Sequence, residues 1–209
     1  MEMLAALLIG CAGVTAPPAS QPFDEHFARV SELLYLPETY LLFFSLDVNG
    51  DGQPEMFVAQ SGSCGNGGCG WHVYTPSQSP GRVKYLGAVG LHAEGFRFQD
   101  GVLTTSWHMS ASEWAWGQYR FHGDTIDQLP GRSCGGKDGA DPAWCESELD
   151  AIRKWRPRAP KVMFGKLPPE ATQQRRSLVW TTRSGEPVPT SEAPTLEGLT
   201  VETATGEKR

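Results

Sequence analysis

The sequence is short of basic residues and of long apolar runs, and each shortage excludes a class of protein. Its 209 residues carry 18 Lys and Arg against 24 Asp and Glu, a net charge of −6 at pH 7. Nucleic-acid binding needs a basic surface that neutralises phosphates, so this balance argues against nucleic acid as the main partner. No apolar run approaches the roughly 18 residues of a membrane-spanning helix. Hydrophobic residues are only 39% of the chain, a low share for a packed domain.

Aromatic residues make up for part of this low apolar content. They form 10% of the chain and include seven Trp, which argues against full disorder. The length suits one domain of ordinary size with tails, and is too small for two large domains.

The N-terminus resembles the signal of a bacterial lipoprotein. A short apolar run, residues 4–9, is followed by Gly10 and Cys11. This resembles a lipobox, in which the Cys is acylated and becomes the new N-terminus. Residues 1–10 are then a signal peptide, although they lack the positive charge that usually precedes the apolar run. Residues 11–22 are small, uncharged and Pro-containing, as in a flexible tether.

Acylation of Cys11, followed by Ala12, implies a protein anchored to the periplasmic side of the outer membrane. The alternative is a frayed N-terminus that carries an ordinary thiol.

The chain has five cysteines, so in a secreted protein one would remain without a disulfide partner. Acylation of Cys11 would leave four cysteines to pair. The remaining four form two local couples, Cys64 with Cys69 and Cys134 with Cys145. Local pairing is favoured because the glycines between Cys64 and Cys69 allow a tight turn. Such disulfides belong to an oxidising compartment such as the periplasm. A four-Cys zinc site is disfavoured, because ten residues between the second couple are too many for a zinc knuckle.

The hydrophobic period predicts an α+β fold. Residues 23–36 show helical spacing and end before Pro37. Short β-like runs follow, separated by turn residues such as Asp100-Gly101 and Gly123-Asp124. The predicted strands are residues 40–46, 55–60, 71–74, 83–88, 95–99, 102–108, 116–122 and 125–129. The fold expected is a mostly antiparallel β meander of seven or eight short strands.

A second helix is predicted after the strands. Asp141 can cap it, Pro142 suits its first position, and Pro157 ends it. The expected domain spans residues 23–165. It has an N-terminal helix at residues 23–36 and a C-terminal helix, and the two disulfides cross-link it. Residues 166–209 are rich in Pro, Thr and Glu, and we expect them to be largely disordered. Within them, residues 178–180 are the one piece able to add a strand.

One motif carries metal chemistry. A loop between two predicted strands has acidic and amide side chains at alternate positions, with glycines between them. Calcium prefers six to eight hard oxygen ligands held by a loop that curls around it. The predicted Ca²⁺ ligands are the side chains of Asp47, Asn49, Asp51 and Glu55, with the backbone carbonyl of Gln53. The alternative is a plain turn, since Asn-Gly and Asp-Gly are common hairpin residues.

The loop is not an EF-hand, because the twelfth position, which should be Glu, is Val58. Its spacing instead resembles the calcium hairpins of FG-GAP and integrin-propeller repeats, here in a single copy. Together with the Cys64–Cys69 loop, it resembles uncharacterised bacterial envelope lipoproteins that carry a DLNGDGxPE hairpin followed by a small Gly-rich disulfide loop. The resemblance covers about 30 residues strongly. It implies a β-rich envelope fold and calcium, and it implies no reaction.

Aromatic residues gather near one predicted hairpin and have two interpretations. Trp114 and Trp116 alternate on one strand, beside a polar stretch at residues 110–113. They either fill the core or form an exposed face for a partner, since Trp and Tyr are common interface anchors. The candidate partner-binding residues are Trp107, Trp114, Trp116 and Tyr119.

Three functions remain in view. A small, acidic, disulfide-clipped lipoprotein is typical of inhibitors and immunity proteins, so a non-enzymatic protein that binds a periplasmic macromolecule is favoured by analogy. A purely structural or assembly lipoprotein is the alternative. A calcium-dependent hydrolase is less favoured, because the serines form no G-x-S-x-G elbow and the five histidines show no H-x-H or H-x-x-x-H spacing.

Overall fold

The computed structural model describes residues 20–22, 41–65, 67–93, 95–110, 113–135, 141–166, 179–196 and 199–202. The predicted helix at residues 23–36 and the lipobox with Cys11 lie outside these residues. The described part contains two β-sheets, one α-helix and two short 3₁₀ turns, η1 (Ser61–Ser63) and η2 (Arg156–Arg158).

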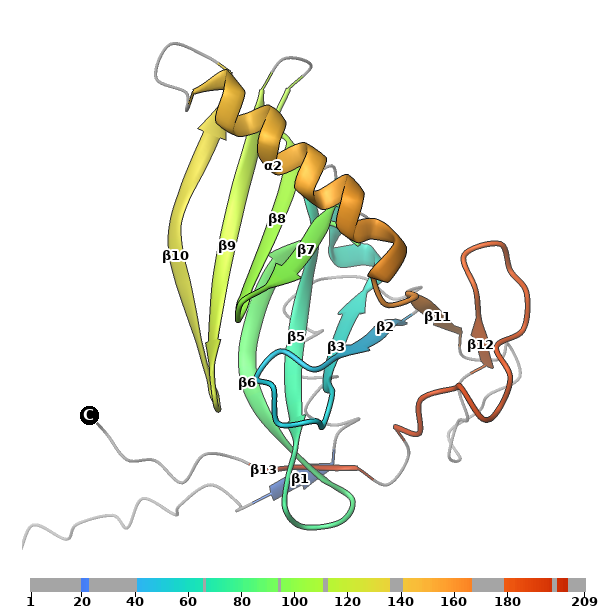
Figure 1. Cartoon of the computed structure of the whole chain (residues 1–209). Coiled ribbons are helices and arrows are strands. Elements are labelled where there is room, and N and C mark those ends of the chain that lie inside the picture. The colour runs from blue at the N-terminus through green and yellow to red at the C-terminus, as the bar shows by residue number, and fades with distance from the viewer. Residues whose placement is uncertain are drawn as a thin grey trace, which may run out of the picture.

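The larger sheet has nine strands, and its central strands are antiparallel (Figure 1). A parallel contact joins β13 to β6, and β4 lies beside β5. The strands in spatial order are β1 (Ser20–Pro22), β13 (Thr200–Glu202), β6 (Arg82–Leu91), β5 (Gly68–Pro76), β3 (Glu55–Gln60), β2 (Leu41–Leu46), β11 (Met163–Lys166) and β12 (Val179–Thr181), with β4 (Cys64–Gly65) off this path.

The smaller sheet is an antiparallel meander of four strands: β7 (Phe96–Gln99), β8 (Val102–His108), β9 (Trp114–His122) and β10 (Thr125–Cys134). Its first hairpin turn follows from the residues there. Asp100 and Gly101 have φ angles of 52° and 73°, the left-handed values that a tight hairpin needs and that Asp-Gly adopts readily.

The prediction of a mostly antiparallel β fold with a helix after the strands and two disulfides is confirmed. All eight predicted strands exist. The count and the single meander are wrong, because the described residues form 13 strands in two sheets. The five additional strands, β1, β4, β11, β12 and β13, have only two to four residues each. One of them, β12, overlaps residues 178–180, the piece of the tail predicted to be able to add a strand. The other four are too short to show a readable period.

The main core lies between the two sheets. Phe44, Phe57 and Trp71 from the larger sheet pack with Leu103 and Phe121 from the smaller one. The rings of Phe44 and Phe57 stack with centroids 4.5 Å apart. The indole of the fully buried Trp71 donates to the Leu91 carbonyl at 3.2 Å, which satisfies its one polar group.

The opposite face of the larger sheet is covered by the C-terminal segment. Phe43, Val58 and Tyr74 point to this face and pack with Trp180 and Val201. Trp180 is 7% exposed and Val201 is fully buried. Within residues 179–196 and 199–202, β12 and β13 are strands of the sheet itself, and the residues between them pack on this face through Val188, Ala193, Leu196 and Leu199. This corrects the expectation of disorder for this part of the tail. A few well-spaced apolar residues suffice here, because a neighbouring apolar surface is already in place.

The helix α2 (Pro142–Trp155) crosses the outer face of the smaller sheet (Figure 1). As predicted, the Asp141 side chain caps it, accepting from the Ala143 N–H at 2.9 Å, and Pro142 occupies its first turn. Cys145 and Ile152 are buried against Trp116 of β9. The Cys134–Cys145 disulfide ties the helix to the end of β10. Arg97 of β7 makes a bidentate ion pair with Glu148 of the helix, with a shortest distance of 2.9 Å.

Candidate functional site

The predicted metal loop, residues 47–55, joins β2 to β3 and is closed by its own polar side chains. Asp47 accepts from the backbone N–H groups of Gly50 at 2.7 Å and Gly52 at 3.0 Å. The Asp51 side chain accepts from the Gln53 N–H at 2.7 Å. The two glycines have φ angles of 79° and 84°, which only glycine adopts at low cost.

Glu55 lies at the base of this loop and is fully buried. One carboxylate oxygen accepts from the Val48 N–H at 2.9 Å, and the other accepts from the Thr75 hydroxyl and the Asn49 amide, each at 3.0 Å. Burial raises the pKa of Glu55, the Asp51 charge adds to the rise, and the bonds from Val48 and Thr75 oppose it. The structure thus holds a carboxyl group whose negative charge is costly and is compensated by neutral donors only.

The Asn49 amide nitrogen links two acids of the loop. It donates to Asp51 at 3.2 Å and to Glu55 at 3.0 Å. In the described part of the chain, no three His, Cys, Asp or Glu side chains form a metal-ligating group. The structure therefore brings Asp51, Asn49 and Glu55 together, while Asp47 is turned toward the loop backbone.

The four candidate partner-binding aromatics do not share a surface. Trp116 is 2% exposed and packs beneath α2, where its indole donates to Cys134 Sγ at 2.9 Å. Tyr119 is buried between the sheets, and its hydroxyl accepts from the Gly90 N–H at 2.9 Å. These two residues belong to the core, which corrects the interpretation of the four as one exposed face. Trp107 and Trp114 are half-buried and line a cleft.

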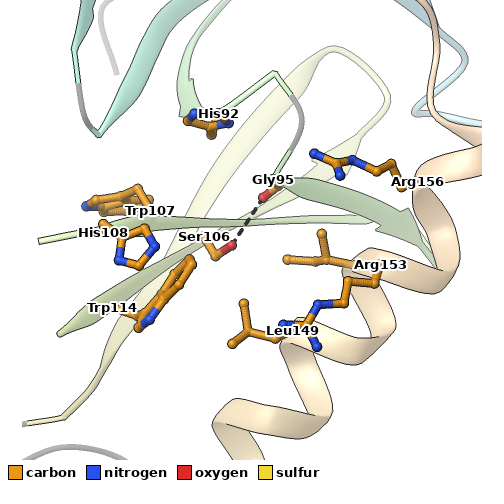
Figure 2. Close-up of a pocket in the computed structure, with 10 residues that line it drawn as sticks. His92, Gly95, Ser106, Trp107, His108, Trp114, Leu149, Arg153 and Arg156 are labelled. Atoms are coloured by element: carbon orange, nitrogen blue, oxygen red, sulfur yellow. Dashed lines mark hydrogen bonds between the residues drawn. The ribbon is translucent and has the colours of Figure 1, made fainter. Parts of the chain in front are cut away.

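This cleft lies where α2 passes the end of β8, the start of β9 and the β6–β7 loop (Figure 2). Its volume is about 250 Å³. We call it the α2 cleft, and its lining residues are His92, Gly95, Ser106, Trp107, His108, Trp114, Leu149, Ile152, Arg153 and Arg156.

Side chains of two kinds meet in the α2 cleft. Arg153 and Arg156 reach it from the helical side, and His92 and His108 from the sheet side (Figure 2). The rings of His108 and Trp114 lie against each other, with centroids 3.4 Å apart. The chemistry of the cleft is therefore cationic and aromatic, which is typical of binding sites and interfaces.

Electrostatics in the α2 cleft act on His92. Burial lowers the pKa of His92, and the positive charges of Arg183, Arg156 and His108 lower it further. The direction of these charge effects shows that the surroundings of His92 carry positive potential.

A serine lies beside the histidines of the cleft, which raises the question of a nucleophile. Ser106 is 4% exposed, and its hydroxyl donates to the Gly95 carbonyl at 3.5 Å (Figure 2). The Ser106 N–H donates to the same carbonyl at 2.8 Å. This serine therefore fastens β8 to the β6–β7 loop, whereas a nucleophile needs its hydroxyl directed at a base.

The sequence did not reveal the basic residues of the α2 cleft. His92 and His108 are 16 positions apart and belong to different strands or loops, so no spacing rule joins them. The only local signal is the pair Arg153 and Arg156, three positions apart at the end of a predicted helix and therefore on one side of it. Without the fold, that pair is indistinguishable from an ordinary solvated surface.

Comparisons of the chain with protein-family models, with curated proteins and with solved structures gave no match. Among the described residues, no helix has both the length and the apolar character needed to span a bilayer.

Proposed function

We propose that the chain is a non-enzymatic lipoprotein of the bacterial envelope that binds another macromolecule through the α2 cleft, in an inhibitor or immunity-type role. The observation that carries this proposal is the meeting of the half-exposed Trp114 with Arg153 and Arg156 in one open cleft. Trp and Arg are the residues most enriched at the energetic centres of interfaces.

The surroundings of the α2 cleft favour binding because they hold its walls in place. The Cys134–Cys145 disulfide and the Arg97–Glu148 ion pair fix α2 to the smaller sheet. On the other side, Trp107 lies against the Cys64–Cys69 loop, 3.6 Å from the position that a Cβ would take on Gly67. A preformed site loses little conformational entropy when it binds a partner.

Two other roles receive less support. A hydrolase needs an activated nucleophile, and the hydroxyl of Ser106 is directed at a backbone carbonyl. A purely structural or assembly role gives no reason for gathering two Arg and two His side chains around one cleft.

The proposed location rests on the sequence resemblance to a lipobox at Cys11. If Cys11 is acylated, cells grown with labelled palmitate incorporate the label into the protein, and the protein fractionates with membranes. A Cys11→Ser variant should take up no label. An unlabelled wild-type protein in the soluble fraction would contradict the anchor.

We further propose that the loop at residues 47–55 binds Ca²⁺ and that the ion stabilises the fold. Its donor chemistry suits a hard cation, because the candidate ligands are all oxygens. The ion would supply the positive charge that the buried Glu55 carboxylate lacks among its present donors. The residues that would hold it are Asp47, Asn49, Asp51 and Glu55, with the carbonyl of Gln53.

Calcium should raise the melting temperature. With an affinity of about 10⁻⁴ to 10⁻³ M, as in extracellular modules, about 10 mM Ca²⁺ should stabilise the fold by roughly 1–3 kcal/mol, or several degrees, over a chelator control. Asp51→Asn, which keeps the oxygen that accepts from Gln53, should abolish most of the shift. Asp100→Asn, in a hairpin turn of the smaller sheet, is the matched control and should retain it. Equal melting temperatures of the wild type in calcium and in chelator would refute the proposal.

Site-specific photocrosslinking tests the binding role. Met109 is 63% exposed in the β8–β9 hairpin that adjoins the cleft, whereas Asp124 lies in the turn at the other end of β9. A benzophenone side chain at position 109, in cells of the producing bacterium, should give a discrete adduct that position 124 does not give. Adding the exposed-site change Arg153→Glu should remove that adduct. The same bands from both positions, or an adduct insensitive to Arg153→Glu, would contradict binding through the α2 cleft.

A further inference from the structure

We propose that the α2 cleft recognises an oxyanion, a carboxylate or a phosphate, carried on an apolar or aromatic body. This inference deepens the proposed function and rests on it, because it names the chemistry that the cleft would recognise in its partner.

The N–H donors of the α2 cleft come from two opposed walls. Arg153, in the last turn of α2, and Arg156, in η2, form one wall. His92, from the β6–β7 loop, and His108, at the end of β8, belong to the other (Figure 2). The described residues that line the cleft include no Asp or Glu. A negative group placed between the walls would lie within reach of N–H donors from both of them.

The acids of α2 near the cleft are engaged with cations outside it. Glu148 is paired with Arg97, and both side chains are only 16% exposed. Asp150 is paired with Lys154 at 2.7 Å, one turn along the helix. The positive potential is also felt within the cleft, since Arg156, Arg183 and His108 all act to lower the pKa of His92.

Arginine suits this ligand chemistry better than lysine would. Its planar guanidinium presents paired N–H donors that match the two oxygens of a carboxylate or the oxygens of a phosphate. Both basic side chains that the helical segment contributes to the cleft are arginines, while Lys154 between them is paired with Asp150 and is not a lining residue.

The size and the apolar surface of the α2 cleft indicate that the anion is part of a larger group. A volume of about 250 Å³ equals roughly eight water molecules at about 30 Å³ each, more than a bare oxyanion fills. Trp114, whose ring lies tilted against that of His108, and Leu149 give the cleft an apolar surface beside the charges. An aromatic or aliphatic body can rest there while the anion reaches Arg153 or Arg156.

Calorimetric titration of the purified chain tests this proposal with four probes: phenylacetate, phenyl phosphate, inorganic phosphate and the neutral phenylacetamide. Phenylacetate and phenyl phosphate should each bind at least about tenfold more tightly than phenylacetamide, because the neutral amide cannot form charge-assisted hydrogen bonds with the arginines. Phenyl phosphate should also bind more tightly than inorganic phosphate, because only the former has an apolar body. The ratio of the two aryl anions then distinguishes a carboxylate partner from a phosphate partner.

Variants locate the binding in the α2 cleft. Arg153→Gln and Arg156→Gln keep most of the side chain, and each should lower the affinity for phenylacetate and phenyl phosphate by about tenfold. The matched control is Arg158→Gln, an exposed arginine of η2 that does not line the cleft, and it should leave affinity unchanged. Equal binding of phenylacetate and phenylacetamide, or equal losses in all three variants, would overturn the proposal. If no anion binds while the adduct at position 109 persists, the oxyanion inference fails and the binding role stands. If both are absent, the cleft is not the binding site.

Discussion

Leu42, Phe43 and Phe44 are consecutive in β2, and all three are buried. Because successive side chains of a strand point to opposite faces, such a run requires apolar cover on both faces of the sheet. The same holds for Phe57, Val58 and Ala59 in β3, each with no exposed surface. This two-sided burial is the constraint from which the rest of the architecture follows.

Each face of the larger sheet receives a different cover. The smaller sheet packs on the face that carries Phe44 and Phe57. On the face that carries Phe43 and Val58, the segment between β12 and β13 packs through Val188, Ala193, Leu196 and Leu199, beside Trp180 and Val201 from those two strands of the sheet itself. Placing Trp180 requires a glycine beneath it, since a Cβ on Gly165 would lie 2.9 Å from the indole ring. The tail is therefore part of the domain where it is described, and its Pro-rich composition marks an irregular path across the sheet.

The helix α2 packs on the outer face of the smaller sheet. Trp116 and the Cys134–Cys145 disulfide hold the helix at the start of β9 and the end of β10. Past that contact the helix runs by the end of β8, the start of β9 and the β6–β7 loop, and the α2 cleft lies along this edge. The proposed binding role thus depends on two layers of packing that themselves depend on the larger sheet.

The sequence predicted local features well. The strands, the Asp100-Gly101 turn, the Asp141 cap and both disulfides follow from residues that are neighbours in the chain. It could not predict how the layers associate. The run Leu42-Phe43-Phe44 signals apolar packing on both faces, but nothing local says that Trp180, more than 130 residues later, joins the core on the second face. The sequence could not predict the α2 cleft for the same reason, because His92, His108 and Arg156 come together only when the sheets and the helix have packed.

The measurement that tests this account most directly is the effect of removing a C-terminal side chain from the core on the second face. Trp180→Ala deletes a buried indole that packs edge-on against Phe43, with ring centroids 5.8 Å apart. It should lower the free energy of unfolding by about 3–5 kcal/mol in chemical denaturation. Val179→Ala, at the adjacent position that is 54% exposed, should cost less than about 1 kcal/mol. Equal and small losses in the two variants would mean that the C-terminal segment contributes nothing to the core on this face, and the two-sided burial on which the architecture depends would be contradicted.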